Sequence, residues 1–317
     1  MSDAIKLACV FPGQGSQAVG MLDSLADRPE VAALLSLADR SLGEPALSQL
    51  IAHGPADDLA LTTNTQPAML VASLACYRAW LAAGGRPADV VAGHSLGEYT
   101  ALVAAGVLSD EQAIPLTRLR ADAMQTAVPV GEGGMAAILG LDDDQVAKAC
   151  EQAREACGGL TVAPANFNAP AQVVIAGHTA AVQKACELAK ALGAKRALPL
   201  AVSAPFHSSL LAPAGVRLAS ALADLRLASP AIALINNVDV AVETEPDRIR
   251  DALVRQASNP VRWVEVVRAM SAMGVTHVVE FGPGKVLTGL VGRIDKSLTA
   301  FCVHDAQSLQ AGLERLA

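Results

Sequence analysis

One serine in this chain stands in a sequence pattern that is typical of an activated nucleophile. In the stretch VAGHSLGEYTALVAAG, residues 91–106, Ser95 lies between Gly93 and Gly97. The apolar residues ADVVAG before it predict a short buried strand, and GEYTALVAAGVL after it predicts a helix. Gly-x-Ser-x-Gly at such a junction indicates a nucleophile elbow, in which a strained turn exposes the serine hydroxyl. An ordinary strand-to-helix turn is the alternative that this short pattern leaves open.

A serine nucleophile needs a base within hydrogen-bond reach, and His207 in VSAPFHSSLL is the candidate. His94 is adjacent to the serine, but we expect its side chain to point the other way on the strand, which makes it a poor base. Between Ser95 and His207 no acidic residue stands at a strand end where it could orient the histidine, as one does in serine hydrolases. A backbone carbonyl could orient the ring instead, and the resulting Ser–His dyad favours acyl transfer.

Two arginines in LTRLRADAMQ indicate how a charged substrate could be held. Arg118 and Arg120 lie two positions apart in a predicted helix that is otherwise apolar, and such positions do not share a face. We therefore expect one guanidinium to be solvated and the other to point inward to the cleft. An inward guanidinium near an acyl-serine needs an anionic partner, which a dicarboxylic substrate supplies. Two surface arginines are the alternative.

The glycine-rich loop FPGQGSQAVG follows a first buried strand. Gly13-x-Gly15-x-x-Ala18 fits the dinucleotide-binding fingerprint, but that fingerprint requires a second strand ending in an acidic residue about 20 positions later. The corresponding stretch, EVAALLSLADRSL, has helical periodicity, which argues against a nucleotide site. The loop can instead aim a backbone N–H at an oxyanion, and we expect the amides of Gln14 and Leu96 to form an oxyanion hole.

A second glycine-rich turn, EFGPGKVLTGL, covers residues 280–290 and is similar at first sight to a phosphate-binding loop. A Walker A motif requires serine or threonine after its lysine, whereas Val286 follows Lys285 here. We therefore expect a tight turn between a strand and a helix rather than a phosphate site.

The order of the predicted elements indicates an α/β protein with two parts. Strands and helices alternate over residues 1–130 and 203–317, which predicts a large α/β-hydrolase-like domain with a mainly parallel, helix-covered sheet. Residues 131–202 begin at a glycine-rich hinge and follow the order strand, helix, strand, strand, helix, strand. This order predicts an inserted ferredoxin-like subdomain.

The composition argues against several classes of protein. Hydrophobic residues make up 52% and charged residues 17%, with a net charge of −7 and no basic run, which argues against nucleic-acid binding. The apolar stretch 68–85 is broken by Arg78 and falls short of about 18–20 clean residues, so we expect a buried helix and no membrane contact. The N-terminus lacks the basic region of a signal peptide, and six cysteines without CxxC spacing favour a cytoplasmic protein. The histidines show no metal-ligand spacing, so we expect no metal.

Several longer stretches carry a family resemblance over essentially the whole chain. They are FPGQGSQ (11–17), GHSLGEY (93–99), RLRADAMQ (118–125), AVPVGEGGMAAILGL (127–141), NFNAPAQVVIAG (166–177), SAPFHS (203–208), NP (259–260) and EFGPGKVLTGL (280–290). With them the chain resembles the malonyl-CoA:acyl carrier protein transacylases of bacterial type II fatty-acid synthesis, which are related to polyketide acyltransferase domains. One departure is Ala121, where the family often has glycine after the arginine.

The resemblance implies a role for each catalytic candidate. Ser95 would carry the malonyl ester, and His207 would act as base and then as acid. Gln14 and Leu96 would supply the oxyanion amides. The main-chain carbonyl of Gln256 would orient the histidine, in agreement with the missing acidic partner.

The resemblance also implies how the substrate is held. Arg120 would clamp the malonyl carboxylate, and Gln256, Phe206 and Met124 would belong to the substrate-binding site. Phe206 is similar to the bulky residue of malonyl-selective acyltransferase domains, where it would fill the space that a methylmalonyl branch needs.

The partners implied are malonyl-CoA and the phosphopantetheine thiol of an acyl carrier protein, for fatty-acid or polyketide chain extension. Neither a metal nor a bound cofactor is required, and we expect a monomer. An acidic enzyme that meets an acidic carrier needs a local basic patch, for which the candidates are Lys195, Arg196, Arg262 and Lys285. A hydrolase with the same nucleophile and a non-catalytic carrier-docking module are the two alternatives. The arginine and the missing acidic residue speak against the first, and the presence of both Ser95 and His207 speaks against the second.

Overall fold

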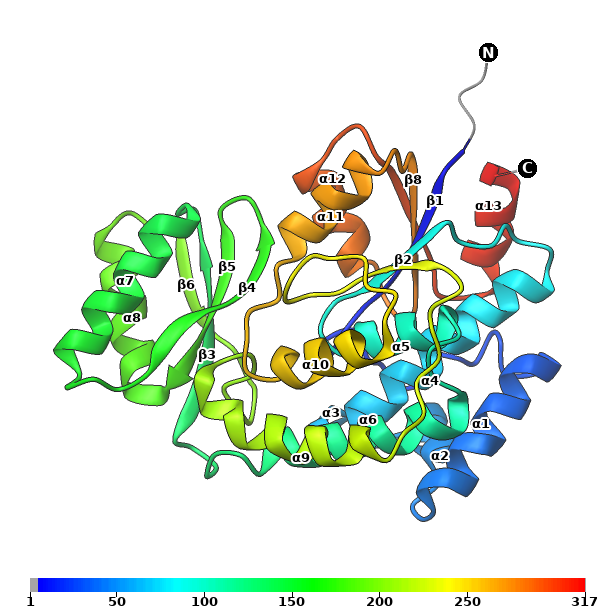
Figure 1. Cartoon of the computed structure of the whole chain (residues 1–317), viewed down its shortest axis with the longest axis horizontal. Coiled ribbons are helices and arrows are strands. Elements are labelled where there is room, and N and C mark those ends of the chain that lie inside the picture. The colour runs from blue at the N-terminus through cyan, green and yellow to red at the C-terminus, as the bar shows by residue number, and fades with distance from the viewer. Residues whose placement is uncertain (1–4, 317) are drawn as a thin grey trace.

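Two β-sheets organise the molecule, and the computed structural model describes them within residues 5–316 (Figure 1). The larger sheet has the order β7-β2-β1-β8-β9, and its neighbouring strands run parallel. The smaller sheet has the order β4-β5-β3-β6 and is antiparallel. The larger sheet consists of β1 (Leu7–Phe11), β2 (Val90–Gly93), β7 (Ala233–Ile235), β8 (His277–Phe281) and β9 (Thr299–Val303). The smaller consists of β3 (Gly133–Leu139), β4 (Val162–Ala169), β5 (Gln172–His178) and β6 (Arg196–Pro199). The predicted α/β fold, with a parallel sheet and a second, ferredoxin-like unit, is confirmed.

Helices cover both sheets. Those around the larger sheet are α1 (Pro29–Leu42), α2 (Leu47–His53), α3 (Ala56–Ala60), α4 (Thr62–Ala82), α5 (Gly97–Ala104), α6 (Asp110–Gln125), α9 (Ala212–Ala223), α10 (Pro246–Gln256), α11 (Trp263–Ala272), α12 (Val286–Ile294) and α13 (Ala306–Leu316), with a short 3₁₀ turn at Ser209–Leu211. Those on the smaller sheet are α7 (Asp143–Ala156) and α8 (Thr179–Ala191).

The central strand β1 shows why the larger sheet is covered on both faces. All five of its residues, LACVF, are buried, with no polar residue alternating along it. Leu7, Cys9 and Phe11 belong to one hydrophobic cluster, whereas Ala8 and Val10 belong to the cluster on the opposite face. A strand that is apolar on both sides is typical of a parallel sheet enclosed between helix layers.

Helix α4 is the apolar segment that could have been mistaken for a membrane span. It lies within the larger hydrophobic cluster, and its residues Trp80 and Leu70 are fully buried. Arg78 reaches the surface of the protein and pairs with Asp110 at 2.6 Å. The predicted buried helix is confirmed, and no helix in residues 5–316 is long and apolar enough to cross a membrane.

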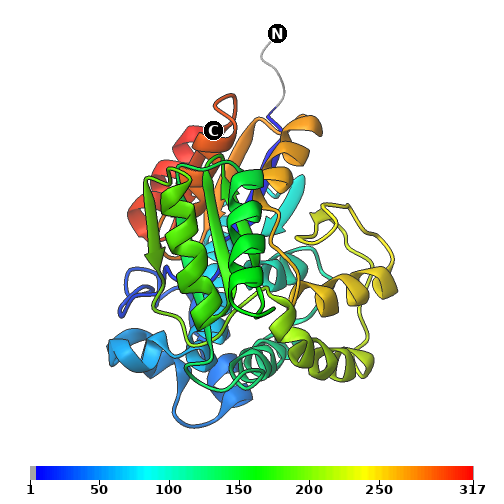
Figure 2. The same ribbon diagram turned by 90° about the vertical axis from the view of Figure 1, so that its left-hand side faces the viewer.

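The smaller sheet has two unlike faces. Ala136 and Ile138 of β3 point toward α7 and α8, which cover the outer face (Figure 2). Met135, Val174 and Ala176 lie on the other face and pack with Phe206 of the larger part. The strand order is that of a ferredoxin-like unit, in which both helices lie on one side of the sheet.

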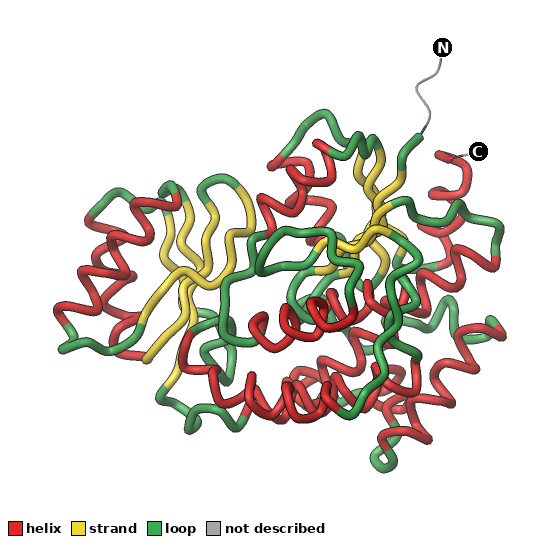
Figure 3. Tube along the Cα trace, viewed as in Figure 1, coloured by secondary structure: helices red, strands yellow, loops and turns green. Residues whose placement is uncertain are grey.

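Three segments join the two sheets. Residues 126–132 and 200–208 are loops that lead into β3 and out of β6 (Figure 3). The third segment runs between α10 and α11 and pairs with the edge strand β4. There Val261 donates its N–H to the carbonyl of Ala165, and Phe167 donates its N–H to the carbonyl of Val261, both at 2.9 Å. These bonds satisfy backbone groups that an open sheet edge would leave unpaired.

Candidate active site

The turn between β2 and α5 has the geometry of a nucleophile elbow. Ser95 has a φ of 54°, a left-handed conformation that is strained for a residue with a side chain. A Cβ atom on Gly93 would lie 1.9 Å from the carbonyl carbon of Gly97. A Cβ atom on Gly97 would lie 1.9 Å from the carbonyl oxygen of Phe11. Both glycines are therefore required by close backbone approach, and the ordinary turn that the sequence left open does not describe this site.

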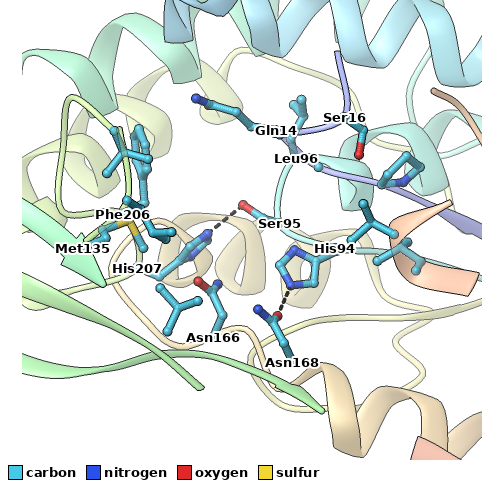
Figure 4. Close-up of a pocket in the computed structure, with 18 of the residues that line it drawn as sticks. Gln14, Ser16, His94, Ser95, Leu96, Met135, Asn166, Asn168, Phe206 and His207 are labelled. Atoms are coloured by element: carbon cyan, nitrogen blue, oxygen red, sulfur yellow. Dashed lines mark hydrogen bonds between the residues drawn. The ribbon is translucent and has the colours of Figure 1, made fainter. Parts of the chain in front are cut away.

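Ser95 and His207 form a hydrogen-bonded pair. The Oγ of Ser95 lies 2.6 Å from Nε2 of His207 (Figure 4). On the other side of the ring, Nδ1 lies 2.9 Å from the main-chain carbonyl oxygen of Gln256. A carbonyl only accepts, so Nδ1 carries the proton and Nε2 is left to accept the serine proton. The structure thus has a backbone carbonyl where a serine hydrolase has a carboxylate.

His207 is neutral in this environment. Burial, reinforced by the nearby charge of Arg120, lowers the pKa of His207 to about 3, although the hydrogen bond to the Gln256 carbonyl raises it in part. The imidazole is therefore a free base at neutral pH, but a weaker one than an exposed histidine.

Arg120 is the inward-pointing arginine of α6. Its side chain is 1% exposed, and its Nη2 lies 3.2 Å from Oγ of Ser95. Gln66 accepts a hydrogen bond from Nη1 at 2.7 Å, and Gln256 accepts one from Nη2 at 2.9 Å. The guanidinium also lies 5.3 Å from the centre of the Tyr99 ring. Its Nε has no hydrogen-bond partner among the described residues.

The other arginine of the pair, Arg118, lies on a different face of α6. It is half-buried, whereas Arg120 is buried, which agrees with the expectation that the two positions do not share a face. Ala121, next to the inward arginine, is fully buried.

Gln14 and Leu96 lie at the same pocket as Ser95 (Figure 4). Leu96 occupies the N-cap position of α5, and Gln14 belongs to the loop after β1. Among residues 5–316 no carbonyl oxygen accepts a hydrogen bond from the backbone N–H of either residue. Two free amides beside a nucleophile are the arrangement expected of an oxyanion hole.

The pocket above Ser95 is a cavity of about 280 Å³ between the two sheets. The smaller sheet and the loop after it line it with Met135, Asn166, Asn168, Gln172, Val174, Leu200 and Val202. Phe206 and Met124 also line it, as the sequence predicted. Gln256 does not line this pocket and is fully buried behind the pair of catalytic candidates. Its hydrogen bonds are to protein groups. Gln256 therefore supports the catalytic candidates from behind and does not belong to the substrate-binding site, contrary to the prediction from the sequence.

The expected orientation of His94 is wrong. His94 lies one residue beyond the end of β2, and its ring lines the pocket. Its Nε2 lies 2.7 Å from Oδ1 of Asn168 on β4 (Figure 4). This bond connects the serine turn to the smaller sheet. His207 alone of the two histidines has a hydrogen bond to Ser95 among the described residues.

Three buried polar residues at the site were not singled out from the sequence. Gln66 of α4 holds Arg120, and Asn237, just after β7, accepts the Ser95 N–H at 2.7 Å. Glu98 of α5 accepts hydrogen bonds from Gln256 and Asn237. No local sequence signal indicates these residues, because their partners lie far away along the chain.

The four basic candidates for carrier docking differ in their availability. Lys195, Arg196 and Lys285 are exposed. Arg262 is half-buried and donates to the carboxylate of Glu265 through Nε at 2.6 Å. Its charge is therefore already paired, and the other three are the better candidates.

In residues 5–316 no cluster of three or more His, Cys, Asp or Glu side chains could hold a metal ion.

A serine on a strained turn after a parallel strand, beside a histidine and two free amides, defines an enzyme of the serine-dependent acyl-transfer class. The chain belongs to the acyl transferase domain family, whose model matches residues 8–307.

Named relatives cover nearly the whole chain. The malonyl CoA-acyl carrier protein transacylase of Escherichia coli K12 is 52% identical over 98% of this chain and 99% of its own. The crystal structure of an acyl-carrier-protein S-malonyltransferase from Burkholderia pseudomallei is 59% identical, with a TM-score of 0.95, covering 98% of this chain and 100% of its own. A malonyl-transacylase solved in complex with a type II PKS acyl-carrier protein is 48% identical, with a TM-score of 0.95, covering 98% and 99%.

Proposed function

We propose that this protein transfers a malonyl group from malonyl-CoA to the phosphopantetheine thiol of an acyl carrier protein, in fatty-acid or polyketide chain extension. One observation carries the proposal. A buried guanidinium, that of Arg120, lies 3.2 Å from the Oγ of Ser95 inside the pocket. An acyl group on this oxygen that ends in a carboxylate can pair with the guanidinium in a bidentate manner. The names of relatives that are 52% and 59% identical support the same substrate and acceptor.

The reaction proceeds in two half-reactions through one covalent intermediate. Nε2 of His207 takes the hydroxyl proton of Ser95 as Oγ attacks the thioester carbonyl. The amides of Gln14 and Leu96 stabilise the oxyanion that forms. When the C–S bond breaks, the imidazolium returns its proton to the CoA thiolate, and the malonyl group remains on Oγ. The carrier thiol then gives its proton to His207, attacks the ester carbonyl and releases the serine oxygen, which regains the proton.

The remaining parts of the proposal concern selectivity and partners. Phe206 and Met124 line the pocket. In this proposal Phe206 fills the space that a methylmalonyl branch would need. Lys195, Arg196 and Lys285 supply positive charge for an acidic carrier. We also propose that the enzyme works as a monomer, without a metal or bound cofactor, in the cytoplasm. All six cysteines are free, as a reducing compartment would keep them.

Intact-protein mass spectrometry tests the proposal directly. Incubation with malonyl-CoA should give one malonyl adduct, and peptide mapping should place it on Ser95. Adding a carrier with its phosphopantetheine arm should remove the adduct and produce malonyl-carrier. Steady release of free malonate without any acceptor would instead support a hydrolase, and the absence of any adduct or transfer would overturn the proposal.

A further inference from the structure

Glu98 is a buried carboxylate that the proposed mechanism does not use. It lies on the first turn of α5, is 1% exposed and does not line the pocket. No Lys or Arg in the described part of the chain forms an ion pair with it. Burying a carboxylate without a cation is costly, so its hydrogen bonds must provide the compensation.

The first partner of Glu98 is the side-chain amide of Gln256. Nε2 of Gln256 donates to Oε2 of Glu98 at 2.8 Å and to the main-chain carbonyl of Ser95 at 3.0 Å. Oε1 of the same amide accepts from Nη2 of Arg120 at 2.9 Å. A carboxylate and a carbonyl can only accept, whereas a guanidinium can only donate. The amide therefore has a single orientation that satisfies all three neighbours, and Glu98 helps to set it.

The second partner of Glu98 is the backbone of Asn237. Its N–H donates to Oε2 of Glu98 at 3.0 Å, and its side-chain Oδ1 accepts the N–H of Ser95 at 2.7 Å. Its Nδ2 donates to the carbonyl of Gly93 at 2.7 Å. Through Gln256 and Asn237, one carboxylate oxygen thus supports the hydrogen bonds to both backbone polar groups of the strained nucleophile.

We propose that Glu98 is a positioning residue for malonyl transfer: its carboxylate fixes the amide of Gln256, which in turn holds the guanidinium of Arg120. The inference rests on the proposed function, because it concerns the residue that would pair with the malonyl carboxylate. In a serine hydrolase, a carboxylate bound to the histidine orients that residue. Glu98 has a similar orienting role here, but because it acts through Gln256 it lies one hydrogen bond further from the reacting atoms.

The acceptor oxygen, rather than the negative charge, performs this task. Both hydrogen bonds to Glu98 end on Oε2, and Oε1 accepts none within residues 5–316. Burial raises the pKa of Glu98 to about 7, against the lowering effects of its two hydrogen bonds and of Arg120, while Asp239 adds to the rise. A proton taken up near neutral pH can therefore reside on Oε1 and leave both contacts in place.

Two substitutions at this position separate the acceptor from the charge. Glu98→Gln keeps an oxygen at the Oε2 position and should preserve kcat/KM for malonyl-CoA and for acetyl-CoA near the wild-type values. Glu98→Leu removes the acceptor and leaves two buried donors unpaired. Loss of such a bond should lower kcat/KM for malonyl-CoA by about 10–100-fold. Acetyl transfer does not use the guanidinium and should fall less, so the malonyl-to-acetyl ratio should drop.

A matched control comes from the other buried carboxylate of this kind. Glu280 is fully buried and accepts hydrogen bonds from the backbone N–H groups of Leu287 and Thr288 at the start of α12. Glu280→Leu should lower the Tm without changing the malonyl-to-acetyl ratio, which shows what loss of a buried carboxylate does by destabilisation alone. If Glu98→Leu does not fold, Gln256→Leu replaces it, because that variant keeps the main-chain carbonyl for His207 and should show the same drop in ratio.

The outcomes separate this inference from the proposed function. An equal loss of malonyl and acetyl transfer in Glu98→Leu, or an unchanged ratio in Gln256→Leu, would overturn the positioning role. A drop in ratio as large in Glu98→Gln as in Glu98→Leu would also overturn it, because the charge would then be what matters. An absent malonyl adduct in the wild-type protein would count against the proposed function itself.

Discussion

The two sheets contribute to the pocket in different ways. The parallel sheet presents Ser95 on a turn in which backbone approach leaves no room for a side chain at either glycine. Around that turn, Arg120, Gln256 and His207 are at most 4% exposed and are tied together by hydrogen bonds. The antiparallel sheet and the loop after it instead line the pocket with four apolar side chains and three amides, and the apolar Leu200 is 37% exposed.

This difference indicates that the parallel side positions the reacting groups, whereas the antiparallel side sets the size of the pocket. A reacting group must be held within a fraction of an ångström, which packed and hydrogen-bonded residues achieve. An apolar wall only needs the right size, and it tolerates volume changes at a cost of a few kcal/mol at most. We therefore expect substitutions on the parallel side to abolish or redirect the reaction and those on the antiparallel side to tune it.

The largest effect is expected for Ser95→Ala. Without the hydroxyl no acyl-enzyme can form, so transfer should fall by about 10⁶-fold, as for other catalytic serines. Intact mass after incubation with malonyl-CoA should show no adduct, while the far-UV circular dichroism is unchanged. Ser73→Ala, at a buried serine in α4, is the control that should still be acylated. An undiminished adduct in Ser95→Ala would mean that another residue carries the acyl group.

His207→Ala should lower the acylation rate by about 10²–10⁴-fold, the usual contribution of a general base. The wild-type pH profile adds a second test. Because the pKa of His207 is lowered to about 3, its neutral form persists as the pH falls through the ordinary histidine range. Titration of this residue should therefore not lower kcat/KM between about pH 8 and about pH 5, since kcat/KM reports the free enzyme. A loss of activity centred on the ordinary histidine pKa would contradict the buried environment described here.

Arg120→Ala should change the substrate preference of the enzyme rather than abolish its activity. A malonyl carboxylate left unpaired in the pocket costs roughly 3–5 kcal/mol. This corresponds to a fall in malonyl transfer of about 10²–10³-fold or more. Acetyl transfer should hold or improve, because the acetyl group has no carboxylate. The measurement is kcat/KM for both thioesters, and an equal loss for both would reduce Arg120 to a role in folding.

The smallest effect is expected on the antiparallel side, for Met135→Ala. Met135 is 6% exposed and lines the pocket from β3, so its truncation enlarges the acyl site without touching the hydrogen-bonded residues. Malonyl kcat/KM should change by about tenfold or less, while the ratio of methylmalonyl to malonyl transfer rises. Ile138→Ala, on the face toward α7 and α8, should destabilise the protein by about 2–5 kcal/mol and leave that ratio unchanged. A fall in malonyl kcat/KM of much more than about tenfold in Met135→Ala would contradict the proposed difference between the two sheets.

Much of this site could be predicted because its signals are local. The glycines around Ser95, the loop after β1 and the two-residue spacing of Arg118 and Arg120 each encode geometry within a few residues. The orientation of His94 was mispredicted because strand alternation was extended one residue beyond Gly93, where the turn has already begun.

Long-range contacts could not be predicted in this way. Gln66, Glu98 and Asn237 come from three separate segments and meet only in the folded protein. A single sequence does not show which buried polar side chains will be neighbours. The pairing of Arg262 with Glu265 is a different case, because two charges three positions apart on a helix are often partners.

The bonds between Val261 and the edge of β4 bear on how such enzymes can be recombined. A chimera that exchanges only the segment from β3 to β6 would set a new edge strand against a foreign partner. The exchanged segment would have to keep a backbone path in which one carbonyl accepts the Val261 N–H, as that of Ala165 does. It would also need an N–H that donates to the Val261 carbonyl, as that of Phe167 does. The unit that can be transplanted is therefore discontinuous in sequence, since it includes the short connection between α10 and α11. A graft that ignores this connection would leave backbone donors and acceptors unmatched beside the pocket.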